Sequence, residues 1–376
     1  MNKNRLAAKC ILFVFIAYRY ILMWLRVNNI VTDFLIIAAI LFSFILLFGK
    51  KLRKKEINFI LLILLFIIIS YIHGRTIDII VSLIIAIFYM NIENSVDNFI
   101  KDFTITSAFF YLMTLLLNSL GIIEQVGSSR LVNGSVDIRN SLGFIHVNST
   151  FLYFIPIFLG ILYINKSKSR NSKIFTLAIL DIISIVLYSI SLCRTGIIIV
   201  FIINLIILFR KFVSNSKICD FLSKYAYVYL PILLILIYRF TANDFSNHSI
   251  NKLLSFRPYY ITQALNTYNF SLLGNDIANT FIVDCAYIKI LLNFGILSYA
   301  MLAYLNIKSY ELLKKDFWLK LIYLVFIMYQ IFENDYLYQT NFLMVIQFLL
   351  LIKYENRREK HTNEISKKNL NNSTNV

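Results

Sequence analysis

Residues 174–211 read IFTLAILDIISIVLYSISLCRTGIIIVFIINLIILFRK, two apolar runs separated by the short polar segment SLCRTG at 191–196. Apolar runs approaching about 20 residues are typical of α-helices that cross the hydrocarbon core of a bilayer. The polar segment between them is too short to be anything but a hairpin. This stretch therefore predicts two antiparallel membrane-spanning helices joined by a tight turn.

The same pattern continues along most of the chain. Hydrophobic residues make up 59% of the sequence and the mean hydropathy is +0.71, whereas soluble chains are about 45 to 50% apolar. Helices satisfy their backbone groups internally where water is absent, and the apolar runs do not alternate as membrane-barrel strands do. We expect an all-α, polytopic integral membrane protein with about 12 spans. The spans are expected at residues 9–25, 30–49, 57–72, 76–91, 99–121, 147–164, 174–192, 196–209, 221–239, 281–305, 317–332 and 338–352.

These spans define a membrane domain at residues 1–354, followed by a polar tail at 355–376 that we expect to be cytoplasmic and disordered. Two loops on the same side of the predicted membrane are longer than tight turns, at residues 122–146 and 240–280. Long ordered loops tend to carry function. The second loop contains LLSFRPYYITQAL at 253–265, which is typical of an amphipathic helix lying on the membrane surface.

The distribution of cations orients the predicted spans. Most of the 37 Lys and Arg residues fall in segments that lie on one side of the membrane when the amino terminus is placed inside. The positive-inside rule then puts both termini in the cytoplasm. A net charge of +17 distributed in this way does not indicate nucleic-acid binding. The outer segments hold Arg26, Arg75, Arg130, Arg139, Arg194, Arg239, Lys252 and Arg257.

The outer cations are almost all arginine, although charge alone would orient the chain equally well with lysine. Guanidinium stays ionised in a partly dry site and binds phosphate through a planar fork of donors. The alternative is that each arginine extends to the lipid headgroups. The sequence has no P-loop or GxGxxG motif, and its four cysteines show no metal-ligand spacing. We therefore expect no cofactor and no metal, so that any reaction must take its energy from the substrate.

Three segments in the first part of the outer surface combine polar groups that suit a charged substrate. RNSLGFIHVNS at 139–149 holds Arg139, His146 and Asn148 at one membrane boundary. Arg194 lies in the hairpin SLCRTG, and an ionisable group on so constrained a turn is a candidate site. Arg257 and Tyr260 lie in the expected surface helix. A histidine with an interfacial structural role and a plain surface helix are the alternatives for the first and third segments.

Two further segments follow near the carboxyl-terminal end. Asp284 and Lys289 lie near the outer end of the expected span 281–305, although a charge in hydrocarbon costs about 2.5 to 3.5 kcal/mol. Glu333 lies in the short outer segment FENDYLYQTN at 332–341. An ion pair that anchors a helix end would explain Asp284 without catalysis, and a solvated turn would explain Glu333.

Taken in order, these segments resemble the Wzy-type bacterial polysaccharide polymerases and the related O-antigen ligases. The resemblance covers residues 139–341. It rests on R-x-S-x-G-F-x-H-x-N at 139–148, S-x-x-R-T-G at 191–196, S-x-R-x-x-Y at 255–260 followed by Gly274, D-x-x-Y at 284–287 followed by Gly295, and Glu333. Asp284 occupies a position where the ligases tend to have histidine, which favours a polymerase.

The resemblance implies an inverting glycosyltransferase at the outer face of the bacterial cytoplasmic membrane. It would join oligosaccharide repeat units carried on undecaprenyl diphosphate into capsular polysaccharide, exopolysaccharide or O-antigen. The resemblance also implies a flippase and a chain-length regulator as partners beside the lipid bilayer. The acceptor hydroxyl needs a base, for which we expect Asp284, a carboxylate at the outer end of the span 281–305, with His146 as the second candidate. The expected substrate-binding residues are Arg139, Asn148, Arg194, Arg257, Tyr260, Tyr287 and Glu333.

Two other functions stay open from the sequence. A ligase of the same fold would move a finished glycan onto a different acceptor. A lipid-linked oligosaccharide flippase or transporter belongs to a different class and should line a central cavity with charge between two related halves. Here the charges collect at the ends of spans.

The predicted orientation is testable by labelling single cysteines in intact cells, in a chain whose own cysteines are replaced by serine. A cysteine at Asn247, in the long outer loop, should react with a membrane-impermeant maleimide. A cysteine at Ser167, in an inner segment, should react only after the membrane is permeabilised. The reverse pattern would invert the topology.

Overall fold

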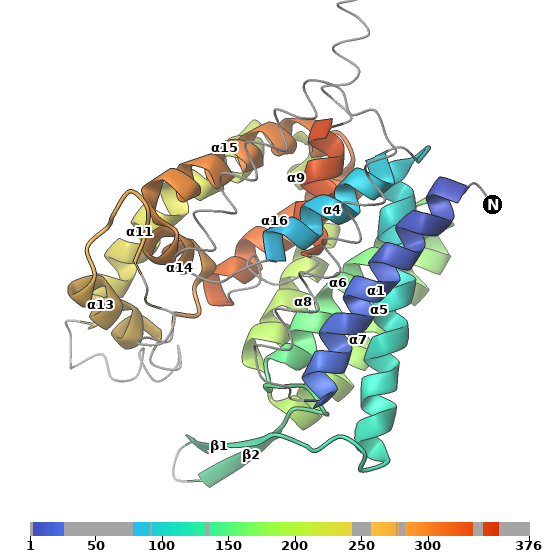
Figure 1. The fold of residues 1–376 in the computed structure, drawn as a ribbon, viewed down its shortest axis with the longest axis horizontal. Helices are drawn as coiled ribbons and strands as arrows, with labels where there is room; N and C mark the ends of the chain where they lie inside the picture. Colours follow the sequence, from blue (N-terminus) through green and yellow to red (C-terminus); the bar gives the residue numbers. More distant parts are fainter. Residues whose placement is uncertain are drawn as a thin grey trace, which may run out of the picture.

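The structure is a computed structural model that describes residues 3–25, 78–90, 92–132, 135–242, 257–275, 277, 283–333 and 341–352. Within these ranges the chain is mostly helical (Figure 1). The expected spans 30–49 and 57–72 and the tail 355–376 lie outside the described residues. The elements are α1 (Lys3–Leu25), α4 (Asp78–Met90), α5 (Ser95–Ser119), β1 (Gly127–Val132), β2 (Ser135–Asn140), α6 (Ser149–Ile164), η1 (Asn165–Ser167), α7 (Arg170–Ser191), α8 (Arg194–Leu208), α9 (Arg210–Asn215), α10 (Lys217–Lys224), α11 (Ala226–Ala242), α13 (Arg257–Thr267), α14 (Ala286–Asn293), α15 (Gly295–Leu313), α16 (Phe317–Phe332) and a last helix, Phe342–Ile352.

Several of these helices could span a membrane. By length and composition, four described helices qualify, and a fifth is added if α10 and α11 form one bent span. Shorter apolar helices include α8 with 15 residues and α16 with 16, which correspond to about 22 to 24 Å at the helical rise. The fold class is therefore confirmed as mostly helical with apolar helices, whereas the expected number of twelve spans is not confirmed. The four qualifying segments are Arg5–Leu25, Ser95–Ser119, Ser149–Ser167 and Arg170–Ser191.

Helix α16 lies between two groups of helices. It contacts α6 and α8 on one side and α14 and α15 on the other. In Figure 1, helices α1, α5, α6, α7 and α8 stand together as one bundle, while α11, α13, α14 and α15 form a second group across α16. Most residues of α16 are buried. The two groups of helices therefore both pack against α16.

The hairpin between α7 and α8 forms at the predicted place. Helix α7 ends at Ser191, Leu192 adopts a left-handed conformation with φ of 50°, and α8 begins at Arg194. Gly196 lies against the ring of Phe151 in α6, and a Cβ added there would come within 2.0 Å of that ring. The glycine of this segment thus lets α8 approach the start of α6 closely.

Four features differ from the expectations. The expected span 281–305 is two helices, α14 and α15, with a turn at Phe294. The expected span 221–239 is interrupted at Tyr225, where α10 and α11 meet at a bend of 75°. The inner segment expected between the spans 196–209 and 221–239 is helical, as α9 and the first part of α10. The expected long loop at 122–146 contains an antiparallel hairpin in which Ser128 pairs with Arg139. The hairpin projects from the end of the helix bundle (Figure 1).

The break between α14 and α15 is stabilised by a loop from earlier in the chain. The amide of Asn275 donates to the carbonyl of Leu292 at 2.8 Å, and the amide of Ile296 donates to the carbonyl of Ser271 at 3.0 Å. Gly274 and Gly295 touch at the centre of this contact, both with positive φ. The loop therefore satisfies backbone groups that the helix break would leave unpaired.

Substitution of Gly274 by alanine should destabilise the protein more than Gly121→Ala. Both glycines have positive φ, which costs alanine about 1 to 2 kcal/mol. At Gly121 an added Cβ meets nothing within 4 Å, whereas at Gly274 it would lie 2.0 Å from the backbone oxygen of Asn293. Thermal denaturation of the purified variants in one detergent measures the difference. Equal losses would show that the contact is not tight.

Candidate functional site

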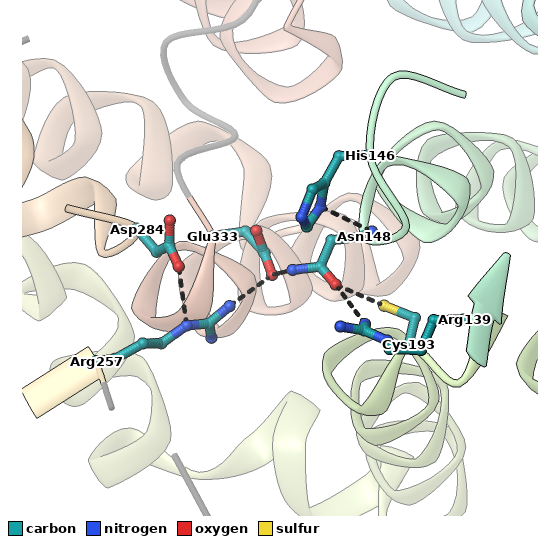
Figure 2. A network of polar contacts seen from close by, with 7 residues as sticks. All are labelled: Arg139, His146, Asn148, Cys193, Arg257, Asp284 and Glu333. Atoms are coloured by element: carbon teal, nitrogen blue, oxygen red, sulfur yellow. Dashed lines mark hydrogen bonds and ion pairs between the residues drawn. The ribbon is translucent and has the colours of Figure 1, made fainter. Parts of the chain in front are cut away.

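Five polar side chains from distant parts of the sequence form one continuous chain of contacts (Figure 2). Arg257 donates from Nε to Asp284 Oδ2 at 3.1 Å and from Nη2 to Glu333 Oε1 at 3.0 Å. Asn148 Nδ2 donates to the same Glu333 oxygen at 2.9 Å. Arg139 Nη2 donates to Asn148 Oδ1 at 3.2 Å. Each contact along the chain thus joins a donor to an acceptor, in the order Arg139, Asn148, Glu333, Arg257 and Asp284.

Asn148 links the two halves of this network. Its amide nitrogen faces the carboxylate of Glu333, and its oxygen accepts from Arg139 and from Cys193 Sγ, which lies 3.6 Å away. An amide is suited to this position because it presents a donor on one side and an acceptor on the other. Asn148 therefore connects Arg139 to Glu333 without adding a charge between them.

A sharp turn after β2 places Arg139 and His146. Asn140 Oδ1 accepts from the amide of Leu142 at 2.8 Å, and Thr150 Oγ1 donates to the carbonyl of Ser141 at 3.2 Å. Phe144 then fills the space below, with its ring 5.0 Å from that of Tyr111. The turn is anchored on both sides, so that the end of β2 is held against the start of α6.

The carboxylates differ in exposure. The side chain of Glu333 is 13% exposed and that of Asp284 is 38% exposed. Glu333 follows the last residue of α16. Burial raises the pKa of Glu333 to about 7, against the opposing effect of Arg257. At neutral pH this carboxyl group therefore exists in both protonation states, and it can accept or release a proton.

Arg257 begins α13, and its two acidic partners determine its state. Burial acts to lower the pKa of Arg257, but the charges of Glu333 and Asp284 raise the pKa above its ordinary value. Arg139 has fewer acidic neighbours. Burial lowers its pKa, and its Nε is buried with no hydrogen-bond partner among the described residues. A buried donor of this kind favours an additional acceptor.

His146 lies beside the network with a defined tautomer. Its Nδ1 accepts from the backbone amide of Asn148 at 3.2 Å. Burial and then the charge of Arg139 lower the pKa of His146, so the ring is neutral at pH 7. A neutral ring whose Nδ1 accepts carries its proton on Nε2. The free nitrogen of His146 is thus a donor in this arrangement.

Cys193 is the member of the site that the sequence did not identify. It is fully buried between α7 and α8, and burial raises the pKa of its thiol to about 12. It therefore stays protonated and donates to Asn148. Its position next to Arg194 in SLCRTG was the available signal, but a cysteine among apolar residues resembles ordinary packing.

The other expected site residues lie outside the chain of contacts. Arg194 begins α8 near Arg139, whose pKa it helps to lower, and it has no ion pair with another described residue. Tyr260 is exposed on α13. Tyr287 is fully buried, and its hydroxyl donates to the carbonyl of Ile327 at 3.0 Å, which is a packing role. The structure thus brings together Arg139, His146, Asn148, Arg257, Asp284 and Glu333 of the expected set.

The site contains no recognisable metal centre in the part of the chain that the structure describes, because no three His, Cys, Asp or Glu residues there are grouped to hold an ion. Comparisons with protein-family models, with curated proteins and with solved structures find no match to this chain. Any functional assignment must therefore come from the geometry of the site and from the sequence motifs that form it.

Proposed function

We propose that this chain is a membrane-bound glycosyltransferase that polymerises oligosaccharide repeat units linked to undecaprenyl diphosphate, at the outer face of the bacterial cytoplasmic membrane. The observation that carries the proposal is the network of Arg139, Asn148, Arg257, Asp284 and Glu333 at the ends of apolar helices. These are residues on which the resemblance to the Wzy-type polymerases rests. If the separate sequence motifs form one site, their residues should lie close together in the structure, as these do.

Three guanidinium groups suit the diphosphate of such a substrate. Among the described residues, the buried Nε of Arg139 has no hydrogen-bond partner and Arg194 has no ion pair, whereas Arg257 is held by two carboxylates. Arg194 also begins a helix of 15 residues, whose amino-terminal end favours an anion. Phosphate oxygens would complete the donor sets of Arg139 and Arg194, while Arg257 is already oriented.

The reaction requires a leaving group and a proton acceptor. The acceptor hydroxyl oxygen would attack the anomeric carbon of the donor sugar, and the bond between that carbon and the diphosphate oxygen would break. The diphosphate leaves with the bonding electron pair, and the arginines stabilise the charge that develops on it. The hydroxyl proton must go to a base at the site.

Among the candidate bases, Glu333 fits best. Asp284 is the more exposed carboxylate and is engaged by the Nε of Arg257. His146 presents a donor rather than an acceptor in the arrangement described above. Asn148 and Arg257 both donate to Oε1 of Glu333, and in Figure 2 its second oxygen points away from those two partners. Thr195 also bonds this carboxylate, so the base lies beside the α7–α8 hairpin. Asp284, the base expected from the sequence, then acts by positioning Arg257.

A ligase-type transfer would use the same groups with a different acceptor. The proposal is therefore tested with the purified chain in nanodiscs, given lipid-linked repeat units as both donor and acceptor. Products that grow by whole repeat units support polymerisation. Transfer only to a different glycan acceptor would indicate a ligase, and flip of the substrate without transfer would indicate a transporter.

Arg257→Lys should insert normally and lose most of its polymerase activity. Lysine keeps the charge but cannot contact Asp284 and Glu333 through separate nitrogens of a planar fork. We expect a loss of about tenfold or more, with single lipid-linked repeats accumulating. Arg239→Lys, at an exposed arginine of α11, is the matched control and should keep its activity. Full activity of Arg257→Lys would exclude Arg257 from the site.

Glu333→Gln should abolish turnover while lipid-linked substrate still binds. The pKa of Glu333 is raised to about 7, so the basic carboxylate form is lost as the pH falls through that value. Wild-type turnover should therefore rise with pH through about 7, and loss of the base should cost about 100-fold or more. Asp284→Asn should be impaired but keep the pH profile. If Asp284→Asn removes the profile and Glu333→Gln keeps it, the roles are reversed.

A further inference from the structure

The end of α16 opposite the arginine network holds a second polar cluster. Lys320 lies near the start of α16, about 20 Å along the helix from Glu333 by the helical rise. It is 1% exposed, and its ammonium group donates to Asp220 Oδ1 at 2.6 Å and to the carbonyl of Val213. Tyr310 of α15 also donates to Asp220 at 2.6 Å. These bonds attach α9 and α10 to α15 and α16.

The face of α9 and α10 turned away from this cluster is apolar and exposed. Ile218 is 73% exposed, Phe212 67% and Phe221 62%. Leu208, Phe209 and Leu222 extend the same exposed surface. Large apolar side chains would be unfavourable in contact with water, and their arrangement on short helices is typical of elements that lie in a membrane interface.

Basic residues accompany the apolar side chains. Arg210, Lys211 and Lys217 are exposed, and the guanidinium of Arg210 lies over the ring of Phe317 at 4.7 Å. The one acidic side chain of the two helices, Asp220, is neutralised by Lys320. The surface that faces outward is therefore both apolar and cationic, and this combination matches the acyl chains and anionic headgroups of one membrane leaflet.

The direction of α10 is consistent with an interfacial position. Helix α10 is bent by 75° from α11. If α11 crosses the bilayer, α10 then runs close to the membrane plane, which is the orientation of an interfacial amphipathic helix. The buried Lys320 cluster holds α10 at this angle, because a rotation would leave a buried ammonium without its partner.

We propose that α9 and α10 lie in the headgroup layer of the leaflet on the side away from the arginine network and bind anionic phospholipid. Phe212, Ile218 and Phe221 insert among the acyl chains, while Arg210, Lys211 and Lys217 contact the phosphates. The inference rests on insertion of the chain in a bilayer and not on the chemistry of the network. A soluble partner or a second copy of the chain on the same surface would be the competing occupants.

The test measures the depth of a nitroxide on the full-length chain in vesicles. The label is attached to Phe221→Cys in a chain with Cys10→Ser and Cys219→Ser, because Cys193 and Cys285 are buried. Vesicles contain phosphatidylcholine with or without phosphatidylglycerol. We expect access to oxygen, exclusion of a water-soluble nickel chelate, and deeper insertion with phosphatidylglycerol. Asn215→Cys, an exposed polar position of α9, should stay accessible to nickel.

The cations are tested by Lys211→Gln combined with Lys217→Gln. This variant should lose the response to phosphatidylglycerol several-fold, and replacement of both lysines by arginine should restore it. Nickel access at Phe221→Cys would overturn the proposal by showing a water-facing surface. Spin–spin broadening between labels would overturn it by placing a second copy there. Because no step measures glycosyl transfer, the result does not depend on the proposed polymerase activity.

Discussion

The rest of the site depends on the hydrogen bonds made to one buried carboxylate, that of Glu333 at the end of α16. Removing an ion from water costs several kcal/mol even after relaxation, and the carboxyl-terminal end of a helix adds an unfavourable dipole. Glu333 occupies such a place directly after Phe332. It is tolerated because Asn148 and Arg257 donate to it from segments far away in the sequence. The start of α6 and the start of α13 must therefore both reach the end of α16.

This requirement explains why the turns of the chain are so constrained. Gly196 allows α8 to lie against Phe151, close to Asn148, and the contact of Gly274 with Gly295 sets the break that precedes α15. The close approach at Gly196 places Cys193 within hydrogen-bonding distance of Asn148. The contact between Gly274 and Gly295 positions α14, which begins two residues after Asp284. Small residues at these points matter because a distance error of about 1 Å separates a hydrogen bond from an unsatisfied buried group. Packing and polar satisfaction are thus coupled in this fold.

The sequence predicted the apolar helices and most members of the site, for different physical reasons. Long apolar runs identified α6 and α16 almost to the residue. The preference for arginine in the outer segments identified Arg139 and Arg257, and the order of the motifs identified Glu333. The break between α14 and α15 was missed, because a run that is apolar on both sides of a break shows no change in pattern. The pair Asn133-Gly134, typical of tight hairpin connections, could have indicated β1 and β2. Tyr287 was expected at the site, but a buried tyrosine serves equally well in packing once a carbonyl accepts its hydroxyl.

Helix α16 carries one charge against its own dipole near each end, in addition to Asp316, which caps its amino-terminal end favourably. Lys320 lies near the amino-terminal end, which favours anions, and Glu333 follows the carboxyl-terminal end, which favours cations. The dipole stabilises neither residue, so each depends on tertiary partners. Lys320 donates to Asp220, which also accepts from Tyr310. Glu333 accepts from Asn148 and Arg257. Helices in a bilayer associate through close packing and interhelical polar contacts, so that buried charged contacts add to what determines their register. A shift of α16 by one helical turn, about 5.4 Å, would separate both Lys320 and Glu333 from their hydrogen-bond partners. The opposed end charges therefore fix the axial position of α16, and with it the distance between the arginine network and the α9–α10 surface.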